Sequence, residues 1–356
     1  MHKDDRMTPN ERMQAFMTGG HLDRLPAMPL FITNSGKIAG MTHREKRSTA
    51  ANQAKAQIDT YRLLGNDTLI IEYGLQGVGM SCGSIMNDPE DDIQSVVDFL
   101  MKDINDVDKL DPEMIKKEKS AWLKLNPEAT EISLEAVGQE VPVNGVISGP
   151  ATACSSLFEI DNLLRAQRKN PEKAHQLYRF VTDALKYVCD EFLKLGAGVF
   201  IADPIASGSL MSERDYRKFV LPYTKELFDH IHSQGAGLGY HICGNARPIV
   251  DAMGEAGANM FSIDDYVPIE EAKEKVGDKT CLFGYVKVNE TMLFGTPKDI
   301  YEEVKENIRG GWDNKCGYIL STGCDVPLHT PMENNIAFMV AARELGKWPI
   351  DPERFI

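Results

Sequence analysis

Eight short apolar runs recur along this chain of 356 residues, and helical patterns separate most of them. Continuous apolar strands that alternate with helices indicate a parallel sheet covered by helices on both faces. Eight such units in one chain predict an α/β fold in which the sheet closes into a (β/α)8 TIM barrel. A doubly wound open sheet is the structural alternative. The eight predicted strands cover residues 27–33, 68–73, 143–148, 198–202, 237–241, 260–264, 281–286 and 318–321.

Two features extend the predicted barrel. Thr8, Pro9 and Glu11 form a capping-box pattern with proline at the first helical position, which predicts a short N-terminal helix. Residues 74–142, after the second strand, are too many for a simple connection, so we expect a helical insertion that overhangs the barrel mouth. The whole chain, 1–356, is expected to be a single barrel domain. The other predicted helices cover residues 44–64, 171–195, 212–234, 248–255, 269–275, 297–309 and 331–345.

Potential metal ligands follow two of the predicted strands. His241 ends the fifth strand, Cys243 comes two residues later, and Cys324 follows the eighth strand. Strand ends of this kind meet at the C-terminal face of a barrel, where active sites lie. One imidazole and two thiolates make a three-ligand set for Zn²⁺ with an open fourth position, as in catalytic zinc sites. The alternative is that these side chains are ordinary buried residues that meet by chance.

Other polar side chains at strand ends are expected at the same mouth. They are candidates for contacting substrate, and a carboxylate among them is a candidate for orienting His241 through its second ring nitrogen. For Asp203 and Asp264, helix capping or turn formation is an equally good explanation. The candidate substrate-binding residues are Glu72, Tyr73, Asp203, Asp264 and Tyr285.

Charge and composition exclude several classes of protein. The formal net charge of −14 argues against binding a nucleic-acid backbone, which needs a basic surface. The seven cysteines show no disulfide framework. No apolar stretch approaches the roughly 20 residues that span a membrane, and the polar start of the chain does not resemble a signal peptide. We therefore expect a cytoplasmic protein whose thiols are free to bind metal.

Several motifs together resemble the uroporphyrinogen decarboxylase superfamily. The resemblance lies in residues 240–248, the Asp203-Pro204 pair, residues 293–297 and residues 323–334. It covers most of the chain and is closest to the zinc-containing branch, the methylcobamide:coenzyme M methyltransferases and their bacterial relatives. This resemblance implies that His241, Cys243 and Cys324 are the zinc ligands and take part in catalysis.

Porphyrinogen decarboxylation itself is not expected. In the decarboxylases, an arginine-rich stretch after the first strand handles the substrate's carboxylates, and a catalytic aspartate follows the second strand. Residues 33–37 of this chain contain no arginine, and Tyr73 stands where that aspartate is expected.

The resemblance implies methyl transfer between a corrinoid and a thiol such as coenzyme M. Zinc would stabilise the thiolate of the substrate, and this thiolate would attack the methyl group of methylcobalamin. The alternative is a donor-side enzyme, in which zinc polarises a methylated donor such as a methoxylated aromatic and a Co(I) corrinoid takes the methyl group. A zinc- or corrinoid-binding barrel without turnover is a third possibility. Residues 229–235 do not match the Asp-x-His-x-x-Gly corrinoid signature, so the corrinoid is expected on a separate partner protein.

Overall fold

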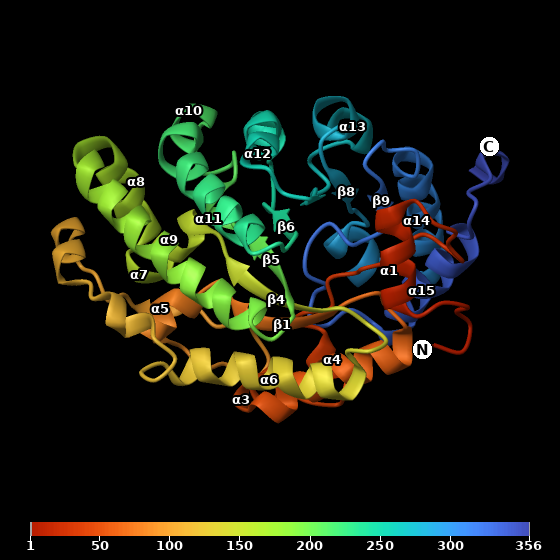
Figure 1. The fold of residues 1–356 in the computed structure, drawn as a ribbon, viewed down its shortest axis with the longest axis horizontal. Coiled ribbons are helices and arrows are strands. Elements are labelled where there is room, and N and C mark those ends of the chain that lie inside the picture. Colours follow the sequence, from red (N-terminus) through yellow and green to blue (C-terminus); the bar gives the residue numbers. More distant parts are fainter. Residues whose placement is uncertain (1, 356) are drawn as a thin grey trace.

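Seven strands form one parallel sheet in the order β1-β4-β5-β6-β7-β8-β9. The computed structural model describes residues 2–355, so Met1 and Ile356, the ends of the predicted domain, lie outside the described residues, and the single-domain organisation stays a prediction. Parallel strands follow one another around the sheet, with helices on the outside (Figure 1). The strands are β1 Leu69–Gly74, β4 Val143–Ser148, β5 Gly198–Ala202, β6 Leu238–His241, β7 Met260–Ser262, β8 Cys281–Phe283 and β9 Tyr318–Ile319.

The first predicted strand, residues 27–33, closes the barrel without becoming a regular strand. Ala27 forms an isolated parallel bridge with Leu320 beyond β9, and its carbonyl accepts a bond from the backbone N–H of Asp67 just before β1. Pro26 and Pro29 have no N–H to donate to a ladder, which explains why the expected strand is reduced to single contacts. The (β/α)8 barrel is therefore confirmed, and the prediction of eight regular strands is wrong at this segment.

The helices cover the outer face of the barrel, and most begin where the sequence predicts. The predicted helix 44–64 is broken in two, because Thr49 adopts an extended conformation and caps α4. The predicted helix 212–234 contains a π-helical turn, Tyr216–Val220, just before Pro222. The helices are α1 Pro9–Thr18, α2 Ser35–Ile38, α3 His43–Ser48, α4 Ala50–Leu64, α5 Gly77–Cys82, α6 Ala121–Val137, α7 Pro150–Leu157, α8 Ile160–Lys169, α9 Pro171–Leu193, α10 Glu213–Asp215, α11 Leu221–Ser233, α12 Val250–Ala256, α13 Ile269–Val276, α14 Pro297–Gly311 and α15 Met332–Leu345.

The segment after β1 differs from the expected helical insertion. It contains α5 and two short 3₁₀ helices, Ile104–Lys109 and Pro112–Ile115, but also an antiparallel hairpin of β2 Ile85–Met86 and β3 Val96–Asp98. Its last helix, α6, contacts β1, β4 and α4, so it is the ordinary connecting helix of the barrel. Only the part before α6 is therefore additional to the barrel.

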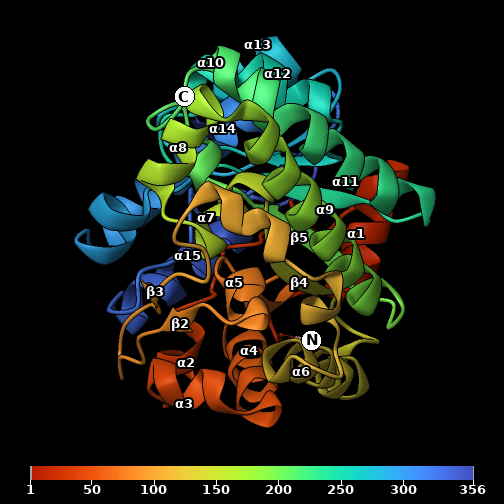
Figure 2. The same ribbon diagram turned by 90° about the vertical axis from the view of Figure 1, so that its left-hand side faces the viewer.

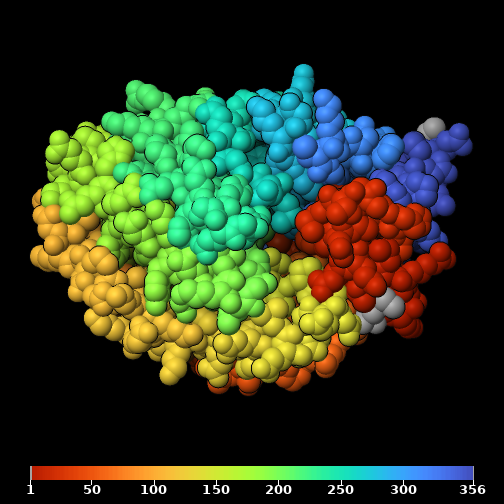
Figure 3. Space-filling model, viewed as in Figure 1, coloured from red at the N-terminus to blue at the C-terminus, as the bar shows by residue number. Residues whose placement is uncertain are grey.

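The N-terminal helix α1 lies on the face of the barrel opposite the β2–β3 hairpin (Figure 2). Thr8 and Glu11 form the predicted capping box at its start. The N-terminal segment packs beside the C-terminal part of the chain (Figure 3), where Arg343 is paired with the buried Asp5. Within residues 2–355, the helices lack the combination of length and apolar character that a membrane span requires.

Candidate metal centre

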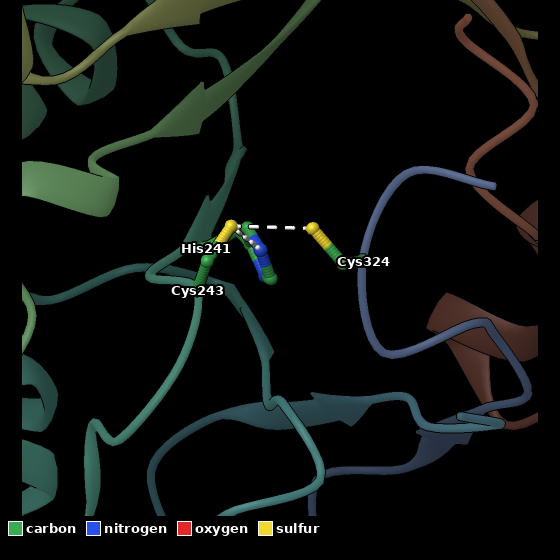
Figure 4. A group of neighbouring side chains, drawn as sticks. All are labelled: His241, Cys243 and Cys324. Carbon is green, nitrogen blue, oxygen red and sulfur yellow. Dashed lines mark hydrogen bonds between the residues drawn. The ribbon is translucent and has the colours of Figure 1, made fainter. Parts of the chain in front are cut away.

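Three side chains converge at the C-terminal end of the barrel (Figure 4). His241 is the last residue of β6, Cys243 follows it, and Cys324 lies in the loop after β9. The Nε2 atom of His241 lies 2.9 Å from Sγ of Cys243, which lies 3.2 Å from Sγ of Cys324. Their ligand atoms all lie within 4.8 Å of one another, and the part of the chain from 2 to 355 holds no second group of this kind. The structure thus brings together the three residues that the sequence predicted as ligands.

A glycine lies next to each of the two cysteines, and Asp264 lies close to both glycines. Gly244 follows Cys243 with φ of 72°, a left-handed conformation that glycine adopts without strain. Its N–H donates to Oδ2 of Asp264 at 2.5 Å. On the other loop, a side chain at Gly323 would meet Asp264 and Tyr285, with its Cβ 3.2 Å from Oδ1 of Asp264. Asp264 is therefore bonded to the loop of Cys243 and leaves no room for a side chain at Gly323 in the loop of Cys324.

A serine holds the second nitrogen of the histidine. Nδ1 of His241 lies 3.0 Å from the hydroxyl oxygen of Ser262, the last residue of β7 and the β-ladder partner of His241. Both residues are buried. When Nδ1 carries the proton and donates to this hydroxyl, the lone pair of Nε2 points to the cysteines and is available to a metal. A carboxylate was one candidate for this role from the sequence, and in the structure Ser262 occupies it.

The electrostatics of the cluster favour a cation. Contact with Cys243 lowers the pKa of the Cys324 thiol, and His241 lowers it further although burial opposes this. Contact with Cys324 and burial raise the pKa of Cys243. Without a metal, the cluster therefore stabilises one thiolate with two neighbouring protons. A zinc ion can replace those protons, since binding by cysteine and histidine releases them, and one nitrogen with two sulfur donors suits Zn²⁺. The residues fit a zinc ion with three protein ligands.

A cavity of about 160 Å³ opens onto the cluster. All three predicted ligands contribute to its wall, together with segments that follow β1 and the other barrel strands. Most of its lining is apolar. Besides the three ligands, the lining residues are Leu30, Ile32, Thr33, His43, Arg47, Glu72, Tyr73, Gly74, Leu75, Gln76, Met80, Ile93, Gln94, Trp122, Val146, Phe200, Ala202, Pro204 and Asp325.

Two of the five predicted substrate-binding residues, Glu72 and Tyr73, line this cavity. Oε2 of Glu72 accepts a bond from Nζ of Lys46 at 3.0 Å. Burial opposes ionisation of Glu72, but Lys46, His43 and Arg47 together outweigh it, so its pKa lies below the ordinary value. The hydroxyl of Tyr73 is bonded to the hydroxyl of Ser81 at 2.8 Å. Their contact with substrate stays a prediction.

The other three predicted substrate-binding residues do not line the cavity, and the structure gives them supporting positions. Asp203 is fully buried and accepts bonds from the backbone N–H groups of Ala151 and Thr152, so it caps the start of α7 from a neighbouring strand. Asp264 accepts a bond from the backbone N–H of Gly244 in the loop of Cys243. Tyr285 is half-buried, and its backbone N–H donates to Asn307. For Asp203 the capping alternative is the one that fits its contacts.

Sequence reasoning missed Asp325 as a cavity residue. Its carboxylate accepts bonds from the backbone N–H groups of Ile32 and Thr33 and from the Thr33 hydroxyl, so it joins the segment after Ala27 to the loop of Cys324. Burial raises its pKa to about 7 despite these bonds. Its position directly after a predicted ligand was the only signal in the sequence.

A second, larger cavity of about 760 Å³ lies at the other end of the barrel. It is lined by residues at the N-terminal ends of the strands and by α1, including Met13, Phe16 and Cys316. None of the three clustered ligands reaches it. The candidate site is therefore the smaller cavity at the C-terminal ends, in keeping with the general rule for TIM barrels.

Known proteins resemble this chain over nearly its whole length. The sequence profile of the uroporphyrinogen decarboxylase (URO-D) family matches residues 8–345. A methylated-thiol–coenzyme M methyltransferase of Methanosarcina mazei is 28% identical over 95% of this chain and 90% of its own length. The methylcobamide:CoM methyltransferase MtaA of Methanosarcina barkeri is 27% identical over 95% and 98%. A solved methyltransferase structure from Methanosarcina mazei superposes with a TM-score of 0.81 at 26% identity, covering 95% of this chain and 99% of that one.

Proposed function

The chain belongs to the uroporphyrinogen decarboxylase (URO-D) family, and from this premise we propose that it is a zinc-dependent methyltransferase that moves a methyl group between a corrinoid and a thiol. The observation that carries the proposal is the cluster of His241, Cys243 and Cys324 at the floor of a cavity. Relatives named as methylcobamide:CoM methyltransferases, matched over nearly the whole chain, support the same reaction. Porphyrinogen decarboxylation gains no support, because Arg47 is the single arginine that lines the described cavity.

The side chains of the cluster have separate tasks in this reaction. His241, Cys243 and Cys324 would hold Zn²⁺. The bound ion would stabilise the thiolate form of the substrate. Ser262 keeps the imidazole in the orientation and tautomer that ligation needs. The apolar cavity wall excludes water and aligns the substrate sulfur with the incoming methyl group. The substrate sulfur would form the new S–CH₃ bond while the Co–C bond of the corrinoid breaks. The electron pair of the broken bond would stay on cobalt, which becomes Co(I).

A methylated corrinoid on a partner protein would approach from the barrel mouth. Four large apolar side chains stand exposed in the loop between β2 and β3 and in the loops after β5, β7 and β8, and we call them the mouth rim: Ile93, Leu210, Tyr266 and Phe294. They are 48% to 78% exposed, and one of them, Ile93, also lines the cavity. The mouth rim is the surface that we propose for the corrinoid protein.

Docking is tested by comparing free and protein-bound corrinoid. Phe294→Ser should slow methyl transfer from a methylated corrinoid protein of the same organism and leave transfer from free methylcobalamin unchanged. Met17→Ser is the matched control, because Met17 is equally prominent but lies on α1 at the opposite face. Equal effects of Phe294→Ser on both corrinoid substrates would contradict docking at the mouth rim.

The reaction is tested by following the absorbance of methylcob(III)alamin under anaerobic conditions with zinc-loaded protein and a panel of thiols. We expect thiol-dependent formation of cob(I)alamin that Cys324→Ser abolishes. Cys316→Ser is the matched control, because Cys316 is exposed at the other end of the barrel. Demethylation that survives Cys324→Ser would contradict the proposed role of the cluster.

A donor-side reaction is the second candidate, and the aromatic lining of the cavity favours it. Tyr73, Trp122 and Phe200 all contribute to the wall and would suit a methoxylated aromatic donor. In that case Co(I) corrinoid would take the methyl group and a phenol would be released. Release of a phenol with formation of methylcobalamin, and no reaction of methylcobalamin with thiols, would favour this reading over the first.

A further inference from the structure

The outward face of α15 carries an apolar stripe. Met332, Ile336 and Val340 follow one another at four-residue spacing on this helix, and they are 37%, 43% and 50% exposed. The inward face is apolar as well, with Phe338 and Met339 buried in the fold. Apolar residues on all faces are typical of a helix that is covered on every side. The stripe therefore indicates a surface that another molecule covers.

A groove of about 420 Å³ continues the stripe towards α4. Ile336 and Val340 line it from α15, and Leu63 lines it from the end of α4. Leu63 is itself 49% exposed. The three predicted metal ligands do not line this groove, so it is separate from the candidate metal centre. We call Leu63, Met332, Ile336 and Val340 the α15 patch.

We propose that the α15 patch binds the same patch on a second copy of the chain, and that the two copies form a dimer with twofold symmetry. A twofold interface uses the same surface from both partners, so that surface must be complementary to itself. The apolar centre of the patch meets this condition, because Val340 can pack against Val340 of the other copy. The charges around the centre decide in which direction the two helices run.

One charge of each sign stands at the two ends of the patch. Glu333 lies seven positions before Val340, and Lys347 lies seven positions after it. Both side chains are exposed, and neither has an ionic partner among residues 2–355. A parallel arrangement of the two helices would place equal charges side by side. An antiparallel arrangement centred on Val340 brings Glu333 of each copy to Lys347 of the other, so the charges select the antiparallel dimer.

The other charged side chains of the groove do not oppose this arrangement. The guanidinium of Arg343 donates to the carbonyl of Leu64 at 2.6 Å and is paired with the buried Asp5. The remaining charged residues carry both signs: Lys3, Asp4 and Glu344. At physiological salt the Debye length is about 8 Å, so the charges in contact outweigh the net charge of −14 on each chain.

The proposed dimer leaves both barrel mouths free. α15 follows the loop of Cys324, so it begins at the end of the barrel that carries the metal cluster. Because the two copies of α15 run antiparallel, the two mouths face in opposite directions. Each mouth rim therefore stays accessible to its own corrinoid protein.

Sedimentation equilibrium of the whole protein at physiological salt tests the proposal. We expect mostly dimer at a chain concentration of roughly 0.1 mM. Val340→Glu places two carboxylates beside each other at the centre and should weaken dimerisation at least about 10-fold, with an unchanged far-ultraviolet circular dichroism spectrum. Met17→Glu is the matched control, because Met17 is exposed on α1 outside the patch, and it should leave the dimer intact. A monomeric unmodified protein, or a dimer that Val340→Glu leaves intact, would overturn the proposal.

Reversal of the end charges tests the antiparallel arrangement. Glu333→Lys and Lys347→Glu should each weaken dimerisation by roughly 5- to 30-fold, because each dimer holds two of these pairs and a reversal turns their attraction into repulsion. The double variant exchanges the two charges and should bind within about threefold of the unmodified protein. Single reversals without effect, or a double variant as weak as the single ones, would overturn the antiparallel dimer.

Discussion

Replacing Ser262 with alanine should weaken zinc binding by about one to two orders of magnitude. Ser262 is 1% exposed, and its hydroxyl is the partner of Nδ1 of His241 at 3.0 Å. When zinc occupies Nε2, the proton must sit on Nδ1, and without the serine this buried N–H has no acceptor. In the metal-free protein the ring can also hold its proton on Nε2, beside Cys243, whereas zinc at Nε2 leaves Nδ1 as the proton's only position, so the penalty is larger in the zinc-bound state.

The size of the effect follows from the cost of an unpaired buried donor. That cost is about 1–3 kcal/mol, which corresponds to roughly 5- to 150-fold in affinity at 1.4 kcal/mol per tenfold. Loss of hydrogen-bond partners behind metal ligands typically costs about 10- to 100-fold, which agrees with this range. Competition with a chromophoric zinc chelator at neutral pH measures the affinity directly.

Ser148→Ala is the matched control for this experiment. Ser148 is also a fully buried serine at a strand end, but its hydroxyl has no hydrogen-bond partner in the described structure. Its replacement should leave zinc affinity unchanged. A zinc affinity of Ser262→Ala within about twofold of the unmodified protein would refute the reasoning, since the cost of an unpaired donor would then be missing.

Three further outcomes follow from the structure. Asp67→Asn should lower the free energy of unfolding, measured in urea, by about 3 kcal/mol or more. The reason is that the buried carboxylate of Asp67 accepts hydrogen bonds from both Arg12 and Arg24. A loss below about 1 kcal/mol would contradict this. Burial opposes ionisation of Asp23, but the bond and charge of Arg12, together with Arg6 and Arg24, outweigh it and lower its pKa from 3.8 to about 2. The stability from Asp23, about 2 kcal/mol, is thus present above pH 3.8 and lost as pH falls towards 2. The difference in unfolding free energy between the unmodified protein and Asp23→Asn should shrink over that range, and a constant difference would argue against it. Removing zinc with a chelator should abolish thiol-dependent demethylation and leave the far-ultraviolet circular dichroism unchanged, because the three ligands do not belong to the hydrophobic clusters that fill the barrel. Loss of the helical signal would contradict this.

The candidate site was largely visible in the sequence because its ligands sit at strand ends. Alternating strands and helices predict a barrel, and the barrel places His241 and Cys324 at one face although 83 positions separate them in the chain. The partner of the histidine was not visible in this way. Ser262 is one small polar residue at the end of an apolar strand, and only the register of β6 and β7 shows that it faces the ring.

Some differences from the predicted fold have their cause in the adjacent sequence, and others depend on contacts between residues far apart in the chain. Pro26 and Pro29 are a local signal that the first run lacks ladder donors, and this signal was present in the sequence. Asp203 caps α7, which begins about fifty residues earlier on the neighbouring unit, so its role depends on tertiary contacts. The β2–β3 hairpin is short and partly exposed, with no alternating pattern long enough to predict it.

The most direct test of the account is zinc K-edge X-ray absorption of the zinc-loaded protein with and without a bound thiol. The central claim is that His241, Cys243 and Cys324 hold zinc and leave one position for the substrate. We expect a first shell with one nitrogen at roughly 2.0–2.1 Å and two sulfurs at roughly 2.3 Å. Addition of the thiol should raise the sulfur count from two to three. A shell with four protein ligands, or a sulfur count that the thiol leaves unchanged, would contradict the claim.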